Sequence, residues 1–169
     1  MKKWKEGIIT RGVLLDVPKH CKEDFVTQEK PIHGWELEDI VKSEGITLEP
    51  GDPICVYGSQ DKWDEVNPTW SSDPNGHPGL HASCLKFLRE ADCCLVVWDI
   101  MGFAPNGYDL RWSVHGAIFL YGIGLLDYAL LQPLYEACSK ENRYEFMPTV
   151  NPLGVIGRTG SPVNPIALL

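Results

Sequence analysis

Short apolar runs separated by polar stretches divide the chain into segments typical of strands and helices. Residues 8–15 (IITRGVLL) are β-branched and mostly apolar and predict a first strand. Residues 53–57 predict a second strand, which a Pro-Gly-Asp turn precedes. The run at 93–98 (CCLVVW) is apolar throughout, as in a strand buried on both faces. Residues 144–150 and 162–168 predict the last two strands.

Apolar positions at helical spacing occupy most of the remaining chain. We expect helices at residues 35–41, 80–91, 112–121 and 129–140, the third ending at Gly122. Strands and helices that alternate in this way predict an α/β protein with a mixed β-sheet flanked by helices. The chain of 169 residues is long enough for one domain with its own core, so we expect a single domain over residues 1–169.

Three polar stretches are expected to be loops. Residues 18–31 form a charged connection, residues 58–79 show no apolar period, and residues 100–111 contain two glycines and a proline. Long loops in a compact domain are usually functional or mobile. Candidate site residues are therefore sought in and beside them.

Composition narrows the classes of partner. The formal net charge is −8 and no basic stretch offsets it, which argues against nucleic acid or an anionic membrane as a partner. No apolar run is long enough to span a membrane, and no apolar segment follows the Lys-rich start as in a signal peptide. Six cysteines occur without a C-x-x-C pair, so we expect reduced, mostly buried thiols and no structural zinc. Cys93 and Cys94 are read as strand residues, and a cytoplasmic location is expected.

His115 and Asp127 are the first candidates for chemistry. They stand twelve residues apart, and a tight turn at Gly122 can bring them back together. An imidazole that a carboxylate orients can take and give a proton at neutral pH. The alternative is that His115 caps a helix and Asp127 closes a turn.

Aromatic side chains are concentrated in or beside the two longest loops. They can form an apolar wall for a flat, cyclic substrate, because ligand pockets are mostly apolar with few polar groups. Packing in the core and under the loops is the alternative for each of them. The candidates are Trp63, Trp70, Trp98, Phe103, Tyr108 and Trp112.

Two further patterns of polar residues occur in the sequence. The sequence Gly157-x-x-Gly160-Ser161 can present backbone N–H groups and a hydroxyl to an oxyanion, or can simply be a turn before the last strand. His77 and His81 have H-x₃-H spacing, but the Pro-Gly pair between them prevents one helical face from carrying both. We expect His81 in the first turn of a helix and His77 on a loop surface.

Several segments, taken together and in this order, resemble one family. The sequence is similar to the cyclase family of metal-dependent hydrolases, which includes bacterial kynurenine formamidase and isatin hydrolase. This resemblance implies a swivelling β/β/α architecture and a protein that pairs with a second copy. The matching segments are Arg11–Asp16 (RGVLLD), Glu49–Asp52 (EPGD), Pro78–His81 (PGLH), Arg143–Phe146 (RYEF) and Gly157–Leu168 (GRTGSPVNPIAL).

The same resemblance places His115 and Asp127 in a metal site. In the family, a His and an acidic or amide side chain at this spacing complete a site that begins upstream in an H-x-x-x-H-x-D-x-x-x-H motif. The present sequence starts beyond that motif, and it has Asp where many members have Glu. Two protein ligands do not make a catalytic metal site. We therefore expect no tightly bound cofactor, and Zn²⁺ or Mn²⁺ only if another chain completes the ligand set.

These patterns favour an enzyme of this family. It would act on an amide, lactone or enolisable carbonyl of a small cyclic metabolite, aromatic or secondary, with His115, Asp127 and Ser161 as catalytic residues. Metal-assisted hydrolysis and metal-free cyclisation, isomerisation or dehydration both remain open. The alternative is a non-catalytic ligand-binding protein or pseudo-subunit that pairs with a full-length homologue. A homodimer is expected, because uncovered strand edges and apolar surface need a partner.

Overall fold

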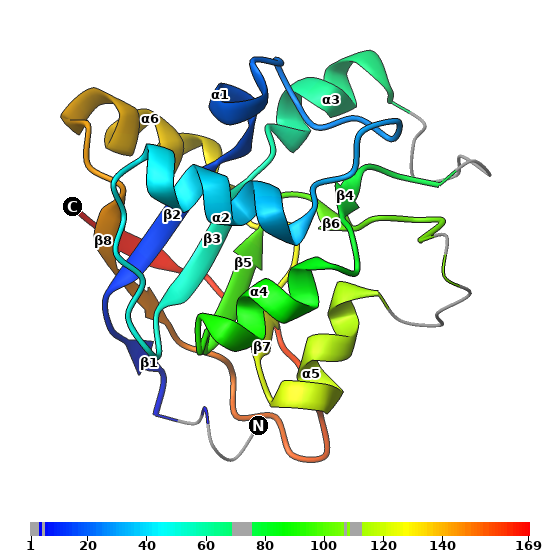
Figure 1. Cartoon of the computed structure of the whole chain (residues 1–169). Coiled ribbons are helices and arrows are strands. Elements are labelled where there is room, and N and C mark those ends of the chain that lie inside the picture. Colours follow the sequence, from blue (N-terminus) through cyan, green and yellow to red (C-terminus); the bar gives the residue numbers. More distant parts are fainter. Residues whose placement is uncertain (1–3, 5, 69–75, 107, 109–112) are drawn as a thin grey trace.

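Four parallel strands form the centre of the sheet. The computed structural model of the chain describes residues 4, 6–68, 76–106, 108 and 113–169. Adjacent strands pair in parallel along the series β2, β3, β5 and β7, so their carboxyl ends share one edge (Figure 1). Their bounds are β2 Gly12–Asp16, β3 Pro53–Tyr57, β5 Leu95–Trp98 and β7 Gly124–Leu126.

Antiparallel strands extend the sheet beside β2. Strand β8 (Glu145–Val150) pairs with both β1 (Ile8–Ile9) and β2, and β9 (Ile166–Leu168) pairs with β8. A separate two-stranded sheet joins β4 (Gly79–Leu80) to β6 (Met101–Gly102). The predicted mixed sheet is therefore confirmed.

Helices lie on both faces of the main sheet. Helices α2 and α4 pack against each other across one face, in front of the strands in Figure 1. Helix α6 packs on the opposite face, because its Tyr135 stacks on Tyr57 at 4.4 Å and side chains alternate between faces along β3. Among the described residues, no helix is both long and apolar enough to cross a membrane. The helices are α1 Val17–Cys21, α2 Gly34–Ser43, α3 Gln60–Val66, α4 Cys84–Glu90, α5 Ala117–Tyr121 and α6 Gln132–Glu141, with a 3₁₀ turn at Val114–Gly116.

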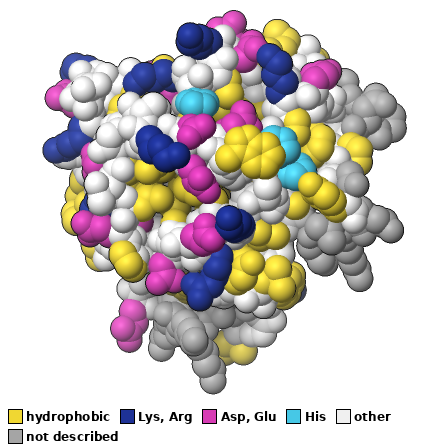
Figure 2. Space-filling view, viewed as in Figure 1, with side chains coloured by type: hydrophobic (Ala, Val, Ile, Leu, Met, Phe, Trp, Pro, Cys, Tyr) yellow, Lys and Arg dark blue, Asp and Glu magenta, His cyan; other side chains and the backbone are white. Residues whose placement is uncertain are grey.

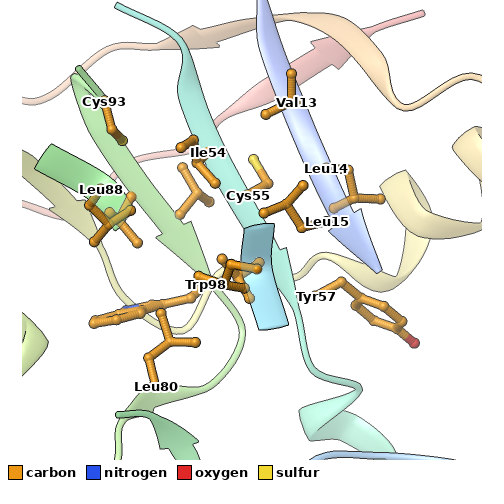
Figure 3. Packing of buried hydrophobic residues seen from close by; sticks show 14 of the residues in the cluster. Val13, Leu14, Leu15, Ile54, Cys55, Tyr57, Leu80, Leu88, Cys93 and Trp98 are labelled. Atoms are coloured by element: carbon orange, nitrogen blue, oxygen red, sulfur yellow. The ribbon is translucent and has the colours of Figure 1, made fainter. Parts of the chain in front are cut away.

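The core is built from strands that are buried on both faces. Every residue of β2, β3 and β5 is buried, as the continuous apolar run at 93–98 predicts. Ile54 and Trp98 lie with Leu88 of α4 and Leu80 of β4 on one face of the sheet, whereas Leu14 lies with Tyr57 on the other face (Figure 3). This packing makes a rigid platform for the strand ends.

The predicted first strand is interrupted, which is a correction. Strand β8 pairs with β2 at Glu145 and Phe146 and with β1 at Thr149 and Val150. Both pairings follow one register, and Pro148 lies between the two paired stretches of β8. Pro148 has no N–H group to continue the ladder there. The run at 8–15 therefore folds as two strands rather than one.

Other predicted boundaries were also wrong. The stretches predicted as loops at 18–31, 58–79 and 100–111 contain part of α1, helix α3 and strand β6. The helix predicted from residue 80 begins at Cys84, because Gly79 and Leu80 pair with β6. Tertiary pairing decides these starts, and local sequence carries little signal for it. The last strand is also shorter than predicted, at Ile166–Leu168.

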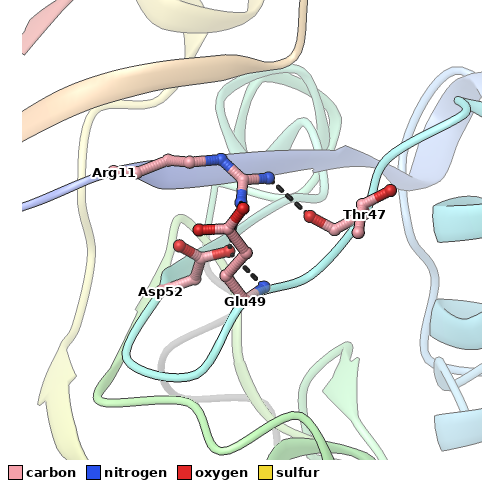
Figure 4. Close-up of polar contacts among 4 residues, drawn as sticks. All are labelled: Arg11, Thr47, Glu49 and Asp52. Carbon is pink, nitrogen blue, oxygen red and sulfur yellow. Dashed lines mark hydrogen bonds and ion pairs between the residues drawn. The ribbon is translucent and has the colours of Figure 1, made fainter.

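A polar network ties together the amino ends of β2 and β3. The Arg11 guanidinium lies 3.3 Å from carboxylate oxygens of both Glu49 and Asp52 and donates to the Thr47 carbonyl (Figure 4). Asp52 also accepts the Glu49 N–H at 2.9 Å. Two of the sequence segments that carry the family resemblance therefore meet in space, where they hold the scaffold.

Candidate active site

The carboxyl edge of the parallel strands gathers acidic side chains. Asp16 is the last residue of β2, and Asp99 and Asp127 directly follow β5 and β7. Open α/β sheets usually bind ligands at this edge. Asp99 has a structural role, because it accepts N–H groups of Gly58 and Gln60 at 2.7 and 3.2 Å and so fixes the start of α3. Burial raises the pKa of Asp99 to about 6, although these backbone hydrogen bonds oppose the shift.

His115 and Asp127 lie together at this edge. His115 Nε2 is 3.5 Å from Asp127 Oδ2. His115 lies in the 3₁₀ turn before α5, and Asp127 follows β7. Gly122 ends α5 in the left-handed conformation (φ 73°), which reverses the chain into β7. The turn that the sequence suggested thus brings the two side chains together.

Trp98 contacts both members of the pair. Its Nε1–H donates to Asp127 Oδ1 at 2.6 Å, and its ring centroid lies 5.3 Å from that of His115. The side chain is fully buried. Strand register explains the contact, because Val97 pairs with Leu126 and the next residue on each strand is Trp98 and Asp127. The structure therefore places Trp98 in the core behind the pair rather than on an open wall.

The two hydrogen-bond partners keep Asp127 ionised. Burial by itself would raise the pKa of Asp127, but hydrogen bonds from His115 and Trp98 outweigh it and lower the pKa below its usual value. Asp127 thus presents an ionised carboxylate to His115.

Ser113 is a polar residue of the site that sequence reasoning missed. It is buried, and its Oγ has no hydrogen-bond partner among the described residues. A Cβ added at Gly102 would lie 3.2 Å from Ser113 Oγ and 3.5 Å from His115 Nδ1, so the hydroxyl and the imidazole border the same backbone of β6. No sequence pattern singles out this serine, because a single serine beside a loop carries no recognisable spacing signal.

The aromatic candidates that the structure describes lie in different environments. Trp63 is buried in α3, Phe103 is half-buried after β6, and Tyr108 is exposed. The Tyr108 ring lies 5.1 Å from His81. Trp70 and Trp112 lie outside the described residues.

Ser161 lies on a different wall from His115. Its Oγ accepts the Leu153 N–H at 2.9 Å and donates to the Pro162 carbonyl at 3.0 Å. Together with Asp127, Ser161 lines an open, largely apolar hollow of about 1220 Å³ between the sheet, α6 and the C-terminal segment. His115 is not among the residues that line this hollow. Asp127 is therefore the common member of the two groups.

The remaining histidines occupy other places than expected. His81 precedes α4 rather than lying in its first turn, and its Nδ1 accepts the Ser83 N–H at 3.1 Å. Burial, with a smaller contribution from the charge of His33, lowers the pKa of His81. His77 is half-buried and its N–H donates to the Ala104 carbonyl, so it is not free loop surface.

The cysteines are thiols inside the fold. All six are free, and Cys55, Cys84, Cys93 and Cys138 are buried. Burial raises the pKa of Cys93 to about 12, so this thiol is a poor nucleophile at neutral pH. Cys94 is only half-buried, which differs from its expected place inside the strand.

The spacing of the His115–Asp127 pair fits two ligands of one divalent ion. Two donors each about 2.1 Å from a tetrahedral Zn²⁺ stand roughly 3.4 Å apart. His115 Nε2 and Asp127 Oδ2 are 3.5 Å apart. Within the described part of the chain, no three His, Cys, Asp or Glu side chains are grouped to hold a metal. The pair can thus supply part of a ligand set, and further ligands would have to come from elsewhere.

Comparison with known proteins defines the class. A family model described as Cyclase matches residues 2–105, and the chain belongs to this family. His115 and Asp127 lie beyond the matched residues, so the match does not test them. The search of curated protein sequences found no match.

Solved structures share the fold. A structure described as a novel cyclase superposes with a TM-score of 0.77 at 23% identity, covering 98% of this chain and 55% of that chain. An isatin hydrolase bound to the product analogue thioisatinate gives a TM-score of 0.72 at 15% identity, covering 95% and 60%. A potential metal-dependent hydrolase with cyclase activity gives 0.53 at 11%, covering 94% and 64%. These likenesses confirm the cyclase-like fold, and the chain spans under two thirds of each neighbour's length.

Proposed function

We propose that the chain supplies the His–Asp part of the active site of a cyclase-family enzyme. The substrate class is an amide, lactone or enolisable carbonyl of a small cyclic molecule. The observation that carries the proposal is the pairing of His115 and Asp127, 3.5 Å apart at the carboxyl edge of the sheet. Family membership supports a cyclase or hydrolase reaction.

In this proposal His115 moves the proton. A histidine near neutral pH can remove a proton from water or from the carbon beside a carbonyl, and can return it to a leaving group. Asp127 holds the imidazole in orientation and stabilises its charged form. In the metal-assisted form of the proposal, His115 and Asp127 would instead be ligands of a divalent ion, which would supply Lewis acidity for a substrate carbonyl and for a water.

A planar cyclic amide is the first substrate to test. One structural neighbour is an isatin hydrolase, and isatin is an aromatic ring fused to a cyclic amide. The hydroxyl of Ser113 beside His115, which has no partner among the described residues, is the group that we propose to contact a carbonyl or amide of such a ring.

The test is turnover of a substrate panel by the purified chain. The panel contains isatin, N-formyl aryl amines and small lactones, each with and without added Zn²⁺ or Mn²⁺. We expect turnover of at least one member that His115→Ala abolishes and His20→Ala, on α1, leaves unchanged. A correctly folded protein that turns over none of them under either condition would overturn the catalytic proposal.

A non-catalytic subunit is the second candidate. It is favoured because the described residues bring only two metal donors, His115 and Asp127, together at the site. In this case the chain alone is inactive, and it raises the activity or stability of a longer family member with which it is mixed. A mixture that shows neither effect, measured with a family member of established activity, would exclude this role.

Self-association is part of the proposal. Phe119, Leu120 and Leu130 expose 74%, 65% and 79% of their surface, and they follow His115 and Asp127 closely in the chain. Exposed apolar side chains in such numbers usually mark an interface. We expect a homodimer by light scattering, and a stable monomer at micromolar concentration would contradict it.

A further inference from the structure

We propose that Trp98 is a positioning residue, which holds Asp127 so that one carboxylate oxygen faces His115. The inference rests on the proposed function for its catalytic meaning, but the contact itself can be tested without a substrate. Trp98 is the last residue of β5, and its side chain is fully buried and contacts both His115 and Asp127.

The two oxygens of the Asp127 carboxylate have different partners. Oδ1 of Asp127 accepts the Trp98 indole N–H at 2.6 Å, and Oδ2 lies 3.5 Å from His115 Nε2. A hydrogen bond to an ionised oxygen is short and strong, so Oδ1 is fixed. The carboxylate plane then has little freedom, and Oδ2 is the oxygen available to the imidazole or to an ion.

Trp98 also holds the backbone turn that follows Asp127. Tyr128 adopts a left-handed conformation (φ 51°), which is uncommon for a residue other than glycine. The Trp98 carbonyl accepts the Ala129 N–H at 2.9 Å on the far side of this residue. Trp98 thus holds the strained turn from both ends, with its main chain at Ala129 and its side chain at Asp127.

The indole side chain of Trp98 suits this role. Indole has a single N–H donor and no acceptor, so its contact with Asp127 can only orient a carboxylate oxygen. Partners of this kind set the direction of a ligand or catalytic group, and their loss usually weakens metal binding by about 10–100-fold. Trp98 also places its ring beside His115, which limits the imidazole on one side.

The experiment uses Trp98→Phe, which keeps a large aromatic ring and the main-chain carbonyl but loses the N–H donor. Trp63→Phe is the matched control, because Trp63 is also buried but lies in α3. In ¹⁵N-labelled protein we expect the Trp98 indole N–H proton to resonate downfield, because this N–H group donates to a carboxylate oxygen. Asp127→Asn should move the Trp98 signal upfield and leave that of Trp63 in place.

A binding measurement separates positioning from general structural support. Zn²⁺ is titrated while the ring nitrogens of His115 are observed, and Trp98→Phe should weaken binding on the order of 10-fold. The same change made in Asp127→Ala protein, which has no side-chain acceptor for the indole N–H, should cost no further affinity, because Trp98 acts through Asp127. An equal loss in both backgrounds would show a merely structural role and would overturn the inference.

Failure of the proposed function looks different from failure of this inference. If Zn²⁺ leaves the His115 signals unchanged in the unmodified chain, the metal-assisted form of the function fails. The positioning role of Trp98 is then tested without metal, by the indole N–H signal and the His115 ring signals. If the indole signal does not respond to Asp127→Asn, or if Trp98→Phe leaves the metal-free His115 ring signals where they were, Trp98 does not position the pair.

Discussion

The two ends of the parallel strands differ in how completely their polar groups are paired. At the amino end, Arg11 joins Glu49 and Asp52, and Asp52 also accepts a backbone N–H (Figure 4). At the carboxyl end, oxygens of Asp16 and Ser113 are buried with no partner among the described residues. Buried polar groups are normally satisfied because an unpaired one destabilises the fold. The amino end is thus closed by its own ion pairs, whereas the carboxyl end, where we propose the active site, has buried oxygens without a described partner.

The surface over α2 and α4 carries charges of both signs. Figure 2 views the face that α2 and α4 cover, where acidic and basic side chains alternate and hydrophobic atoms gather near two histidine side chains. Those charged groups include exposed pairs such as Lys42 with Asp39 and Arg89 with Asp92. Exposed pairs of this kind contribute little to stability.

The largest expected effect breaks the carboxyl end. His115→Ala should reduce turnover on the order of 10²–10⁴-fold, because it removes the proposed general acid–base group. The free energy of unfolding should change little, since the side chain is partly exposed and leaves no large cavity. Turnover and thermal unfolding of the same sample check both statements. Wild-type turnover by a folded His115→Ala protein would show that the site lies elsewhere.

The amino end should respond in the opposite way. Arg11→Met removes the guanidinium and leaves the Asp52 carboxylate, which is almost fully buried, without its charged partner. We expect a loss of roughly 1–3 kcal/mol in the free energy of unfolding, with turnover per folded molecule unchanged. Lys42→Met, which removes an exposed ion pair, is the control and should change stability by less than about 1 kcal/mol. Denaturant unfolding measures the difference. A loss of turnover in folded Arg11→Met protein would mean that the two ends are not independent.

Ser113→Ala sharpens the comparison, since the hydroxyl is buried without a described partner. Removing it should leave stability unchanged or raise it by about 1 kcal/mol, while turnover falls. Ser139→Ala, on the exposed face of α6, should alter neither quantity. Unfolding and steady-state rates report the two effects. A clear loss of stability would show that the hydroxyl has a structural partner instead.

The smallest effect is a dependence of stability on pH. Both carboxylate oxygens of Glu44 are buried without a described partner, and burial, then the charge of Asp16, raises the pKa of Glu44 to about 7. The fold therefore favours the protonated form. Its contribution to stability is complete below the ordinary pKa of 4.5 and is lost as pH rises to about 7.

Glu44→Gln tests this dependence, because an amide has no charged form to disfavour. The variant should lose less stability than the wild type between pH 4.5 and 7. Asp99, whose pKa is about 6, should preserve part of the slope. Glu38→Gln, an exposed change on α2, should keep the wild-type profile. Parallel profiles for Glu44→Gln and wild type, measured by thermal unfolding across this range, would refute the assignment.

The pattern of apolar residues was enough to predict the class of fold. Continuous apolar runs occur where strands are buried on both faces, and the run at 93–98 contains β5 as predicted. The break between β1 and β2 could not be predicted from their own residues, because its cause is Pro148 in a strand far along the chain. Helix α3 was missed for a similar reason, since the carboxylate that fixes its start belongs to Asp99.

The sequence by itself determined the family and singled out His115 and Asp127, whose side chains the structure brings within 3.5 Å of each other. Both depend on local information: motifs, residue types, and a spacing of twelve residues across a glycine turn. Only the tertiary structure decided what surrounds that pair. Trp98 meets Asp127 through the register of β5 and β7, and Ser113 meets Gly102 through the placement of β6. Both contacts depend on how the strands assemble into sheets, and no local sequence pattern encodes that assembly.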